Sequence, residues 1–334
     1  MSSAPTLADV VGVLESLYPP STAEGWDAVG LVAGDPGAEV RKVLFAVDPV
    51  ADVVDEALEW GADLLVTHHP LFLRGVHSVA ATTFKGSVVH RLVTSGCALH
   101  VAHTNADSAP RGVADALADL VGITDRRPLV ARAAAGDASG SSGAASGGAP
   151  GSRAVVGGAL RSRAAVGGNA PGSRADDAAI GIGRVGTLAE PVTLREFAGR
   201  VRDVLPATAQ GIRFSGDPDA LVRTAAVVGG SGDSLFDDVR AAGVDVYVTS
   251  DLRHHPASEL RERAAFEAST AGRPRRPDRP GTPFLVDTAH YASEWPWLRY
   301  AAEDLAAGLG SAGLPPVRTR ISEVVTDPWT GVAR

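Results

Sequence analysis

The sequence of 334 residues contains a single cysteine, Cys97, and only two lysines, Lys42 and Lys85. One cysteine cannot form an intrachain disulfide or a cysteine-based metal site, so any metal must be held by histidines and carboxylates. A chain without disulfides fits a reducing compartment. The shortage of lysine also argues against Schiff-base or lysine-base catalysis.

Long apolar segments are missing too. No run of about 18 or more apolar residues occurs, so no membrane-spanning helix is expected. The first six residues lack a basic region followed by an apolar run, so we expect no secretory signal and predict a cytoplasmic protein. The net charge is −8, and the arginine-rich stretch 261–279 is interrupted by prolines and acidic residues. Nucleic acid is therefore not an expected partner, because phosphate contacts need a positive face.

One segment lacks almost all the residues that build a packed core. Residues 131–180 are dominated by Ala, Gly, Ser, Arg and Pro, and the phrase Ala-Pro-Gly-Ser-Arg-Ala occurs at 149–154 and again at 170–175. Such a segment cannot bury enough apolar surface to offset the entropy of ordering it. The composition predicts a disordered insert between a first half at 1–130 and a second half at 181–334.

Outside this insert, apolar strands alternate with helical patterns. Strands are predicted at 43–47, 64–67, 98–102, 224–228, 244–249 and 284–286. Helices are predicted at 7–14, 50–60, 87–94, 112–121, 194–205, 235–242, 256–266 and 295–309. This alternation indicates an α/β fold with mostly parallel sheets.

The two halves also share an internal repeat. Gly61-Ala-Asp-Leu-Leu-Val-Thr67 resembles Gly243-Val-Asp-Val-Tyr-Val-Thr249, and each is followed within a few residues by His-His-Pro. Segments 98–107 and 284–294 correspond more loosely, as a short strand followed by a histidine and a carboxylate. We therefore predict two related α/β halves facing a shared cleft, because ligands bind at the carboxyl ends of parallel strands.

A histidine pair follows the strand predicted at 64–67. His68 and His69 are either part of a solvated loop or, if the chain turns there, two converging ligands; Pro70 keeps His69 out of a helix. These two explanations weigh about equally. His254 and His255 form a rival pair in the second half, and position alone does not decide between the pairs.

Two further segments combine histidine with a carboxylate. In His103-Thr-Asn-Ala-Asp107, the aspartate is either a ligand or a helix cap, because a carboxylate next to a buried strand must be exposed, paired or metal-bound. His290 and Glu294 are four residues apart and share one face if that segment is helical. Glu294 could instead cap the last helix.

Together these segments favour a metal site at the strand ends. The candidate ligands are three imidazoles and two carboxylates: His68, His69, Asp107, His290 and Glu294. They suffice for two divalent ions if one carboxylate bridges, and nitrogen and oxygen ligands suit Zn, Fe, Mn, Co or Ni equally. Two such ions about 3.5–4 Å apart can activate water to hydrolyse a small-molecule substrate, with His255 or His103 moving protons.

In these motifs the sequence resembles the GTP cyclohydrolase I type 2 homologue family, also called Nif-three-like proteins. The resemblance covers about residues 5–130 and 181–325. The segments that carry it are Trp26–Leu31, Thr67–Pro70, His103–Asp107, Thr249–Asp251 with His255, and His290–Glu294. Ala28, Ala106 and Ser250 stand where the family usually has asparagine, leucine and glycine.

The resemblance implies two related α/β halves, a two-metal site on the five candidate ligands with Glu294 as the bridge, and self-assembly into a ring-shaped hexamer. It places His255 near the metals but outside the ligand set. The expected function is a metal-dependent hydrolase acting on a purine-like ring, a phosphoester or a cyclic amide. The alternative is a non-catalytic metal-binding regulatory or scaffold protein.

A dinucleotide-binding protein is disfavoured. Residues 229–232, Gly-Gly-Ser-Gly, follow a predicted strand and could approach a phosphate. The Gly-x-Gly-x-x-Gly spacing of dinucleotide-binding folds is absent, so these glycines are expected to form a turn that lines the cleft.

Overall fold

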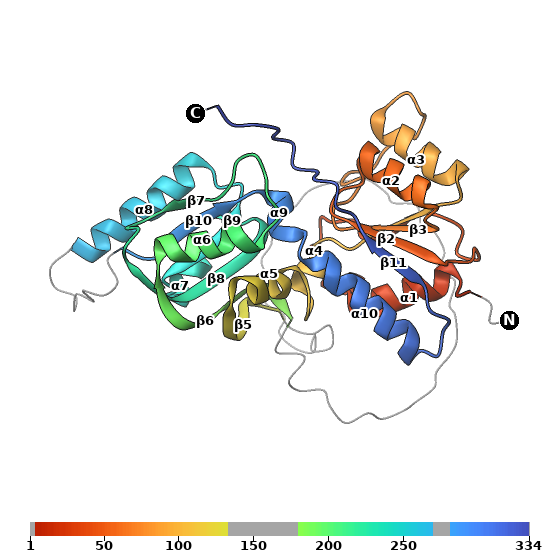
Figure 1. Cartoon of the computed structure of the whole chain (residues 1–334). Helices are drawn as coiled ribbons and strands as arrows, with labels where there is room; N and C mark the ends of the chain where they lie inside the picture. Colours follow the sequence, from red (N-terminus) through yellow and green to blue (C-terminus); the bar gives the residue numbers. More distant parts are fainter. Residues whose placement is uncertain (1–3, 133–179, 270–280, 334) are drawn as a thin grey trace, which may run out of the picture.

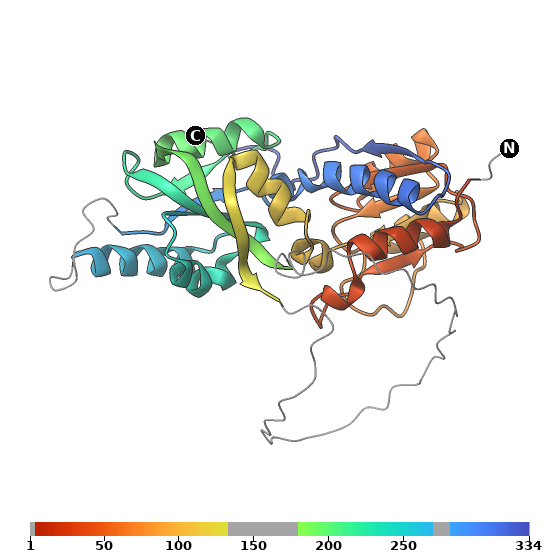
Figure 2. The same ribbon diagram turned by 90° about the horizontal axis from the view of Figure 1, so that it is seen from below.

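The computed structural model describes residues 4–132, 180–269 and 281–333. In these ranges the chain forms two β-sheets with helices packed on their faces (Figure 1, Figure 2), so the predicted α/β class is confirmed. The predicted disordered insert, 131–180, lies almost entirely outside these ranges. Among the described residues, no helix is both long enough and apolar enough to cross a membrane.

The first sheet has the strand order β1-β4-β3-β2-β11. All neighbouring strands are parallel except β1, which runs antiparallel to β4. The strands are β1 (Gly30–Ala33), β2 (Lys42–Ala46), β3 (Leu64–Thr67), β4 (Ala98–Val101) and β11 (Arg318–Ile321). The helices of this half are α1 (Leu7–Leu17), α2 (Ala51–Trp60), α3 (Phe84–Thr94) and α10 (Trp297–Ser311), with the short η1 (Pro20–Thr22).

The second sheet has the strand order β5-β6-β8-β9-β10-β7. Only β8, β9 and β10 are parallel to one another. The strands are β5 (Ile123–Ala131), β6 (Gly181–Thr193), β7 (Arg213–Ser215), β8 (Leu221–Ser231), β9 (Val246–Ser250) and β10 (Phe284–Thr288). The helices are α5 (Val113–Val121), α6 (Leu194–Val204), α7 (Phe236–Ala242) and α8 (His254–Ser269), with η3 (Asp233–Leu235).

The predicted parallel pairing therefore holds for the centre of each sheet, whereas the second sheet carries antiparallel strands at both margins. The strand and helix alternation predicts the parallel centres but not these margins, because β5, β6 and β7 are not among the predicted strands. The division along the chain also differs from the division in space. β5 precedes the insert but pairs with β6, and β11 returns from the second half to pair with β2.

The repeated Gly-x-Asp segments have the same structural role in both halves. Gly61 and Gly243 each end a helix in the left-handed region, at φ of 69° and 66°, where a side chain would be strained. Two residues later, an aspartate accepts two backbone N–H groups from near the start of the neighbouring parallel strand. Asp63 does so at 2.7 and 2.8 Å, and Asp245 at 2.8 and 3.0 Å. The repeat thus fixes the register of two equivalent strand pairs.

Alternate residues of the strands pack on opposite faces of each sheet, as expected from the pleat. In the first sheet, Phe45 packs with residues of α1 and α10, while Leu44 packs with α2 and α3. In the second sheet, Val227 packs with α5 and α6, while Tyr247 packs with residues of α7 and α8. Helices therefore cover both faces of each sheet.

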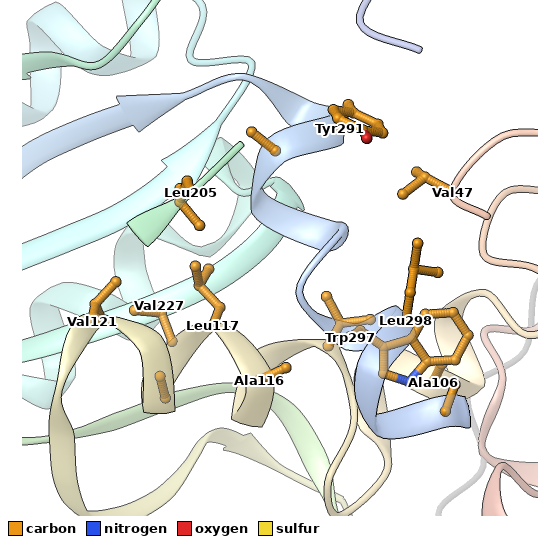
Figure 3. Packing of buried hydrophobic residues seen from close by; sticks show 14 of the residues in the cluster. Val47, Ala106, Ala116, Leu117, Val121, Leu205, Val227, Tyr291, Trp297 and Leu298 are labelled. Atoms are coloured by element: carbon orange, nitrogen blue, oxygen red, sulfur yellow. The ribbon is translucent and has the colours of Figure 1, made fainter. Parts of the chain in front are cut away.

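One cluster of buried apolar residues continues from the first half into the second. Figure 3 shows Trp297 at the start of α10 close to Ala106, and Leu117 of α5 beside Val227 of β8. Because α5 and α10 carry this core across both sheets, the carboxyl ends of the central strands in the two halves are held in a fixed relation.

His100, on β4, is an unusual member of the first sheet. Its side chain is buried, and neither ring nitrogen has a hydrogen-bond partner among the residues that the structure describes. Burial lowers the pKa of His100 to about 4, because the charged imidazolium is poorly solvated there. In the unfolded chain, the imidazole of His100 is protonated near the ordinary histidine pKa of about 6.5. Stability is therefore lost as the pH falls from about 6.5 to about 4.

Replacing His100 with leucine should stabilise the fold against acid. We expect His100→Leu to raise the free energy of unfolding relative to the wild type, by about 2 kcal/mol more at about pH 5 than at about pH 7.5. Urea unfolding at both pH values, with chelator present, measures this difference. The exposed His90, changed to leucine, is the control and should show no such pH dependence. An equal effect of His100→Leu at both pH values would contradict the assignment.

Candidate metal centre

The predicted ligands come together where the central parallel strands of both halves end. His68 and His69 directly follow β3, and His103 follows β4. Two one-turn helices carry the carboxylates: α4 (Thr104–Ser108) contains Asp107, and α9 (His290–Glu294) contains the predicted His290 and Glu294 pair. The two helices follow equivalent strands, β4 and β10, so the internal repeat delivers one carboxylate from each half.

Glu294 lies at the centre of the cluster, with only 3% of its side chain exposed. Its Oε1 is 3.0 Å from His290 Nε2 and 3.5 Å from His68 Nε2, and its Oε2 is 3.0 Å from His69 Nε2. The two oxygens of one carboxylate therefore face imidazoles from both halves. His69 Nε2 and His290 Nε2 are 3.2 Å apart.

His68 is buried, and its two ring nitrogens have different surroundings. Nδ1 lies 2.9 Å from the carbonyl oxygen of Ala102, so it carries the proton and donates it there. Nε2 has no hydrogen-bond partner among the described residues, although Asp107 Oδ1 lies 3.7 Å away. A buried lone pair between two carboxylates fits a bound cation, which would satisfy it.

The other three histidines each bind a carboxylate through Nδ1. His69 binds Asp48 at 2.7 Å, His290 binds Asp251 at 2.7 Å, and His103 lies 3.0 Å from both oxygens of Asp27. Metal-binding histidines are typically oriented in this way, because the outer carboxylate fixes the tautomer and makes the inner nitrogen a better ligand. With Nδ1 occupied, Nε2 is the nitrogen left for a metal.

The outer carboxylates are themselves held in place. Asp27 Oδ2 accepts from Thr104 Oγ1 at 2.6 Å and from the Thr104 backbone N–H at 3.1 Å. This explains the Trp26–Leu31 motif, whose aspartate binds the histidine that precedes α4. Asp251 adopts a left-handed conformation with φ of 55° directly after β9, a conformation that aspartate tolerates better than most residues. Its carboxylate thereby reaches the first residue of α9.

The charges of this cluster balance only because the groups are close together. Burial raises the pKa of Glu294, but the charges of the three neighbouring imidazoles outweigh it and hold the pKa well below its ordinary value. Burial lowers the pKa of His290, but Glu294 and the bond to Asp251 raise it to about 10. In the absence of metal, protons on histidine supply the positive charge that the buried carboxylate requires.

The pKa values of Asp107 and His103 shift in the directions opposite to those of Glu294 and His290. Burial raises the pKa of Asp107 to about 6. The positive charge of His68 opposes this rise, and the negative charge of Glu294 adds to it. Burial and the neighbouring His68 lower the pKa of His103 to about 4, despite the bond to Asp27. His103 is therefore a neutral imidazole at neutral pH, which is the form that binds metals or accepts a proton.

A cleft of about 450 Å³ opens on this cluster. His69, His103 and His290 reach it from the metal side, so the candidate centre is accessible to a small molecule. The remaining walls come from three parts of the chain: Asp48, Pro70 and Leu73 of the first half, Gln210, Asp251 and Tyr291 of the second half, and Thr326, Asp327, Pro328 and Trp329 of the C-terminal segment.

The structure thus brings four of the five predicted ligands, His68, His69, His290 and Glu294, into one cluster and adds His103 to it. Among the described residues, two groups lie close enough to hold a metal ion, namely His68, His69 and His103, and His69, His290 and Glu294. Asp107 belongs to neither group, and its Oδ1 lies 3.7 Å from His68 Nε2. His255, predicted to move protons, lies exposed on α8 with its ring packed against His254 at 5.2 Å. No contact between His255 and the cluster occurs among the described residues.

The glycines at 229–232 are packing positions and not a phosphate loop. They run along the end of β8, and an added Cβ would meet a neighbouring side chain in each case. At Gly232 it would lie 2.2 Å from both Thr249 Oγ1 and Tyr247 OH. The expectation that these residues form a turn lining the cleft is wrong, because β8 continues to Ser231 and none of them lines the 450 Å³ cleft. Gly229 and Ser231 line a smaller pocket beside Asp107 instead.

Comparison with known proteins finds relatives that match nearly the whole chain. A "GTP cyclohydrolase 1 type 2 homolog" of Streptomyces coelicolor is 48% identical, covering 98% of this chain and 94% of the relative. A protein of the same name from Mycobacterium tuberculosis is 40% identical, covering 97% and 96%. The crystal structure of a Bacillus cereus protein related to NIF3 has the same fold, with a TM-score of 0.74 at 22% identity over 99% of this chain and 100% of that one.

The family match itself spans nearly all of the chain, including both halves and the C-terminal segment. Residues 5–328 match the description Duf34/NIF3 (NGG1p interacting factor 3). The resemblance expected from the motifs is therefore confirmed, and the chain belongs to the Duf34/NIF3 family.

Proposed function

We propose that this protein is a metal-dependent hydrolase with two divalent ions in the cleft between its halves. The ions would be held by His68, His69, Asp107, His290 and Glu294. One ion would take His68 and Asp107, the other would take His69 and His290, and Glu294 would bridge them. The native metal, among Zn, Fe, Mn, Co and Ni, is not distinguished by these ligands.

The observation that carries this proposal is the buried carboxylate of Glu294, with a different imidazole facing each of its oxygens. Its neighbours His69 and His290 are oriented from behind by Asp48 and Asp251. A structural ion pair would not need two imidazole nitrogens 3.2 Å apart, whereas two metal ligands on one ion lie at about that separation.

Divalent ions in such a site supply Lewis-acid activation of water and of a substrate oxygen. The chain contributes the groups around them. His103 lines the cleft, and its ring centroid lies 5.3 Å from that of His68 and 5.7 Å from that of His69. Because Asp27 fixes its tautomer, His103 can accept a proton through Nε2. We therefore assign proton transfer to His103, since the exposed His255 makes no contact with the site.

GTP is the first substrate to test, because the relatives are named GTP cyclohydrolase 1 type 2 homologs. A phosphoester or cyclic amide hydrolase would need the same metals. A ring-shaped hexamer and a cytoplasmic location stay predictions from the sequence, and sedimentation of the purified protein would test the first of them.

Elemental analysis of protein purified without added metal or chelator tests the metal site. We expect about two transition-metal ions per wild-type chain. The double variant His68→Ala with Asp107→Ala should lose at least one of them, because one ion loses both of its non-bridging ligands. The exposed His90→Ala is the matched control and should keep the full content. A wild type that holds no metal and takes up none on reconstitution would refute the proposal.

Gly230 offers a second test that changes no ligand. A Cβ at this residue would lie 2.6 Å from Glu294 Oε1 and 3.1 Å from His290 Nε2. Gly230→Ala should therefore displace both ligands and reduce the metal content by more than half. Gly96→Ala is the control: its φ of +70° matches the +68° of Gly230, but no atom lies within 4 Å of the added Cβ. Equal metal loss in the two variants would show that backbone strain alone is responsible.

Turnover distinguishes a hydrolase from a metal-binding scaffold. With a substrate found in a screen that begins with GTP, Glu294→Gln should lower kcat/KM at least about tenfold, because removing even an outer partner of a metal ligand has an effect of this size. His90→Ala should keep the wild-type rate. If Glu294→Gln binds metal and turns over normally, the catalytic role is wrong. If metal-loaded wild type hydrolyses nothing in the screen, the non-catalytic alternative is favoured.

A further inference from the structure

The C-terminal segment forms one wall of the metal cleft. After β11 it is tied down by Ser322, whose carbonyl oxygen accepts from Trp295 Nε1 at 2.9 Å and whose backbone N–H donates to Phe45 at 2.8 Å. Thr326 Oγ1 then donates to Asp48, the carboxylate that orients His69. Figure 1 shows this segment leaving the first sheet and running over α9 toward the second half. The wall is therefore hydrogen-bonded to Asp48 and, through this carboxylate, connected to the proposed ligand His69.

The far end of this wall presents apolar surface to the cleft. Trp329 lines the cleft and is 66% exposed, and Leu73 on the β3–α3 connection lines it and is 44% exposed. Pro70 and Pro328 also line it. Exposed apolar side chains that gather at one cleft, unlike ones scattered singly, mark a surface that a ligand or partner covers. A rigid indole at the mouth of a small-molecule cleft is suited to stacking on a flat ring.

Polar side chains among the described residues that line the cleft include a hydrogen-bond acceptor, Asp327, but neither lysine nor arginine. Asp327 lines the cleft, and its Oδ2 is buried without a hydrogen-bond partner among the described residues. An N–H group of a ligand would satisfy it. Neither lysine nor arginine is among the residues found to line the cleft, so a phosphate group would meet no cationic side chain there.

The charge balance of the whole site points the same way. Six carboxylates surround the histidine cluster and its cleft: Asp27, Asp48, Asp107, Asp251, Glu294 and Asp327. Two divalent ions would bring four positive charges, fewer than the six negative ones. A loaded site would stay net negative, which opposes a highly anionic ligand and favours a neutral or positively charged one.

We propose that the wall Thr326–Trp329 determines which ligand the cleft accepts, and that this ligand is an uncharged or cationic flat heteroaromatic ring. The ring stacks on Trp329 and donates an N–H to Asp327, with its reactive edge toward the histidine cluster. A nucleoside triphosphate is excluded as the preferred ligand by the same charges. This inference rests on the proposed function for the metals, but the recognition of the ring does not require them.

Guanosine and GTP are matched probes, because they share one ring and differ in charge. Calorimetric titration of the full chain, metal-loaded and metal-stripped, should show guanosine binding in both forms and GTP binding at least about threefold more weakly. Adenosine, thymidine and 1-methylnicotinamide extend the test to other rings and to a cationic one. Failure of every ring to bind, or GTP binding as tightly as guanosine or more tightly in either form, would overturn the proposal.

Variants locate the recognition. Trp329→Ala should weaken binding of the ring about tenfold, the size expected for loss of one base–aromatic stack, whereas Trp329→Phe should stay within about threefold. Phe84→Ala, which removes another exposed aromatic side chain outside the cleft, is the control. The metal content should be unchanged in all three. Wild-type affinity in Trp329→Ala would refute the role of the wall.

The two proposals fail separately. A wild type without metal refutes the hydrolase, yet the ring titrations on the same metal-free protein still decide the role of Trp329. Conversely, full metal content with no effect of Trp329→Ala leaves the proposed hydrolase standing and refutes the proposed role of the wall.

Asp327→Asn adds a finer test, because it keeps the shape of the side chain and removes its charge. The substitution should weaken binding of the cationic ring more than binding of guanosine, and it should reduce the difference in affinity between guanosine and GTP.

Discussion

The buried carboxylate of Glu294 is the constraint on which the site depends. An ionised carboxylate with 3% of its surface exposed is stable only if positive charge lies next to it. Three imidazoles within 3.5 Å of its oxygens provide that charge when protonated, and metal ions provide it when bound. The imidazoles need acceptors in turn, which explains why Asp48 and Asp251 lie behind His69 and His290. The charge of Glu294 thus accounts for the imidazoles around it, and the imidazoles account for the carboxylates behind them. Without that charge, neither set of groups would be needed.

Internal duplication explains how a chain gathers such a cluster. Each half supplies parallel strands whose register is set by a Gly-x-Asp segment, and each half ends its third parallel strand in a one-turn helix that carries a carboxylate. The two sets of strand ends face each other because the chain crosses over twice. β5 joins the second sheet before the insert, and α10 and β11 return to the first. Trp297 at the start of α10 is fully buried, with its ring 5.4 Å from that of His68. The core that joins the halves therefore begins directly beneath the metal ligands.

The sequence predicted what depends on local pattern. Local pattern predicts the central strands, most helices and the gathering of His68, His69, His290 and Glu294, because periodicity and the position of polar residues after strands are visible within a few residues. The outer carboxylates were missed: Asp48 and His69 are 21 residues apart, and Asp27 and His103 are 76 apart, so no local pattern joins them. The Trp26–Leu31 motif was the one available signal for Asp27. β11 is not predicted because its exposed Arg-Thr-Arg-Ile lacks an apolar run. The proton-transfer role considered for His255 rests on its place after a predicted strand, and such a position does not specify which residues it contacts.

The C-terminal segment shows why a ligand set alone does not define a function. Histidine and carboxylate ligands on two facing halves would support many hydrolytic reactions, and nothing in the cluster itself selects a substrate. Selection requires contacts beyond the metals. We proposed above that the C-terminal segment supplies them; it has no regular structure, yet Thr326 hydrogen-bonds to Asp48, the carboxylate behind His69. Any ligand that displaces the wall would also disturb the carboxylate that orients His69. The two proposals together imply that recognition of the ligand and binding of the metals are coupled through Asp48, because this one carboxylate accepts from Thr326 and orients His69.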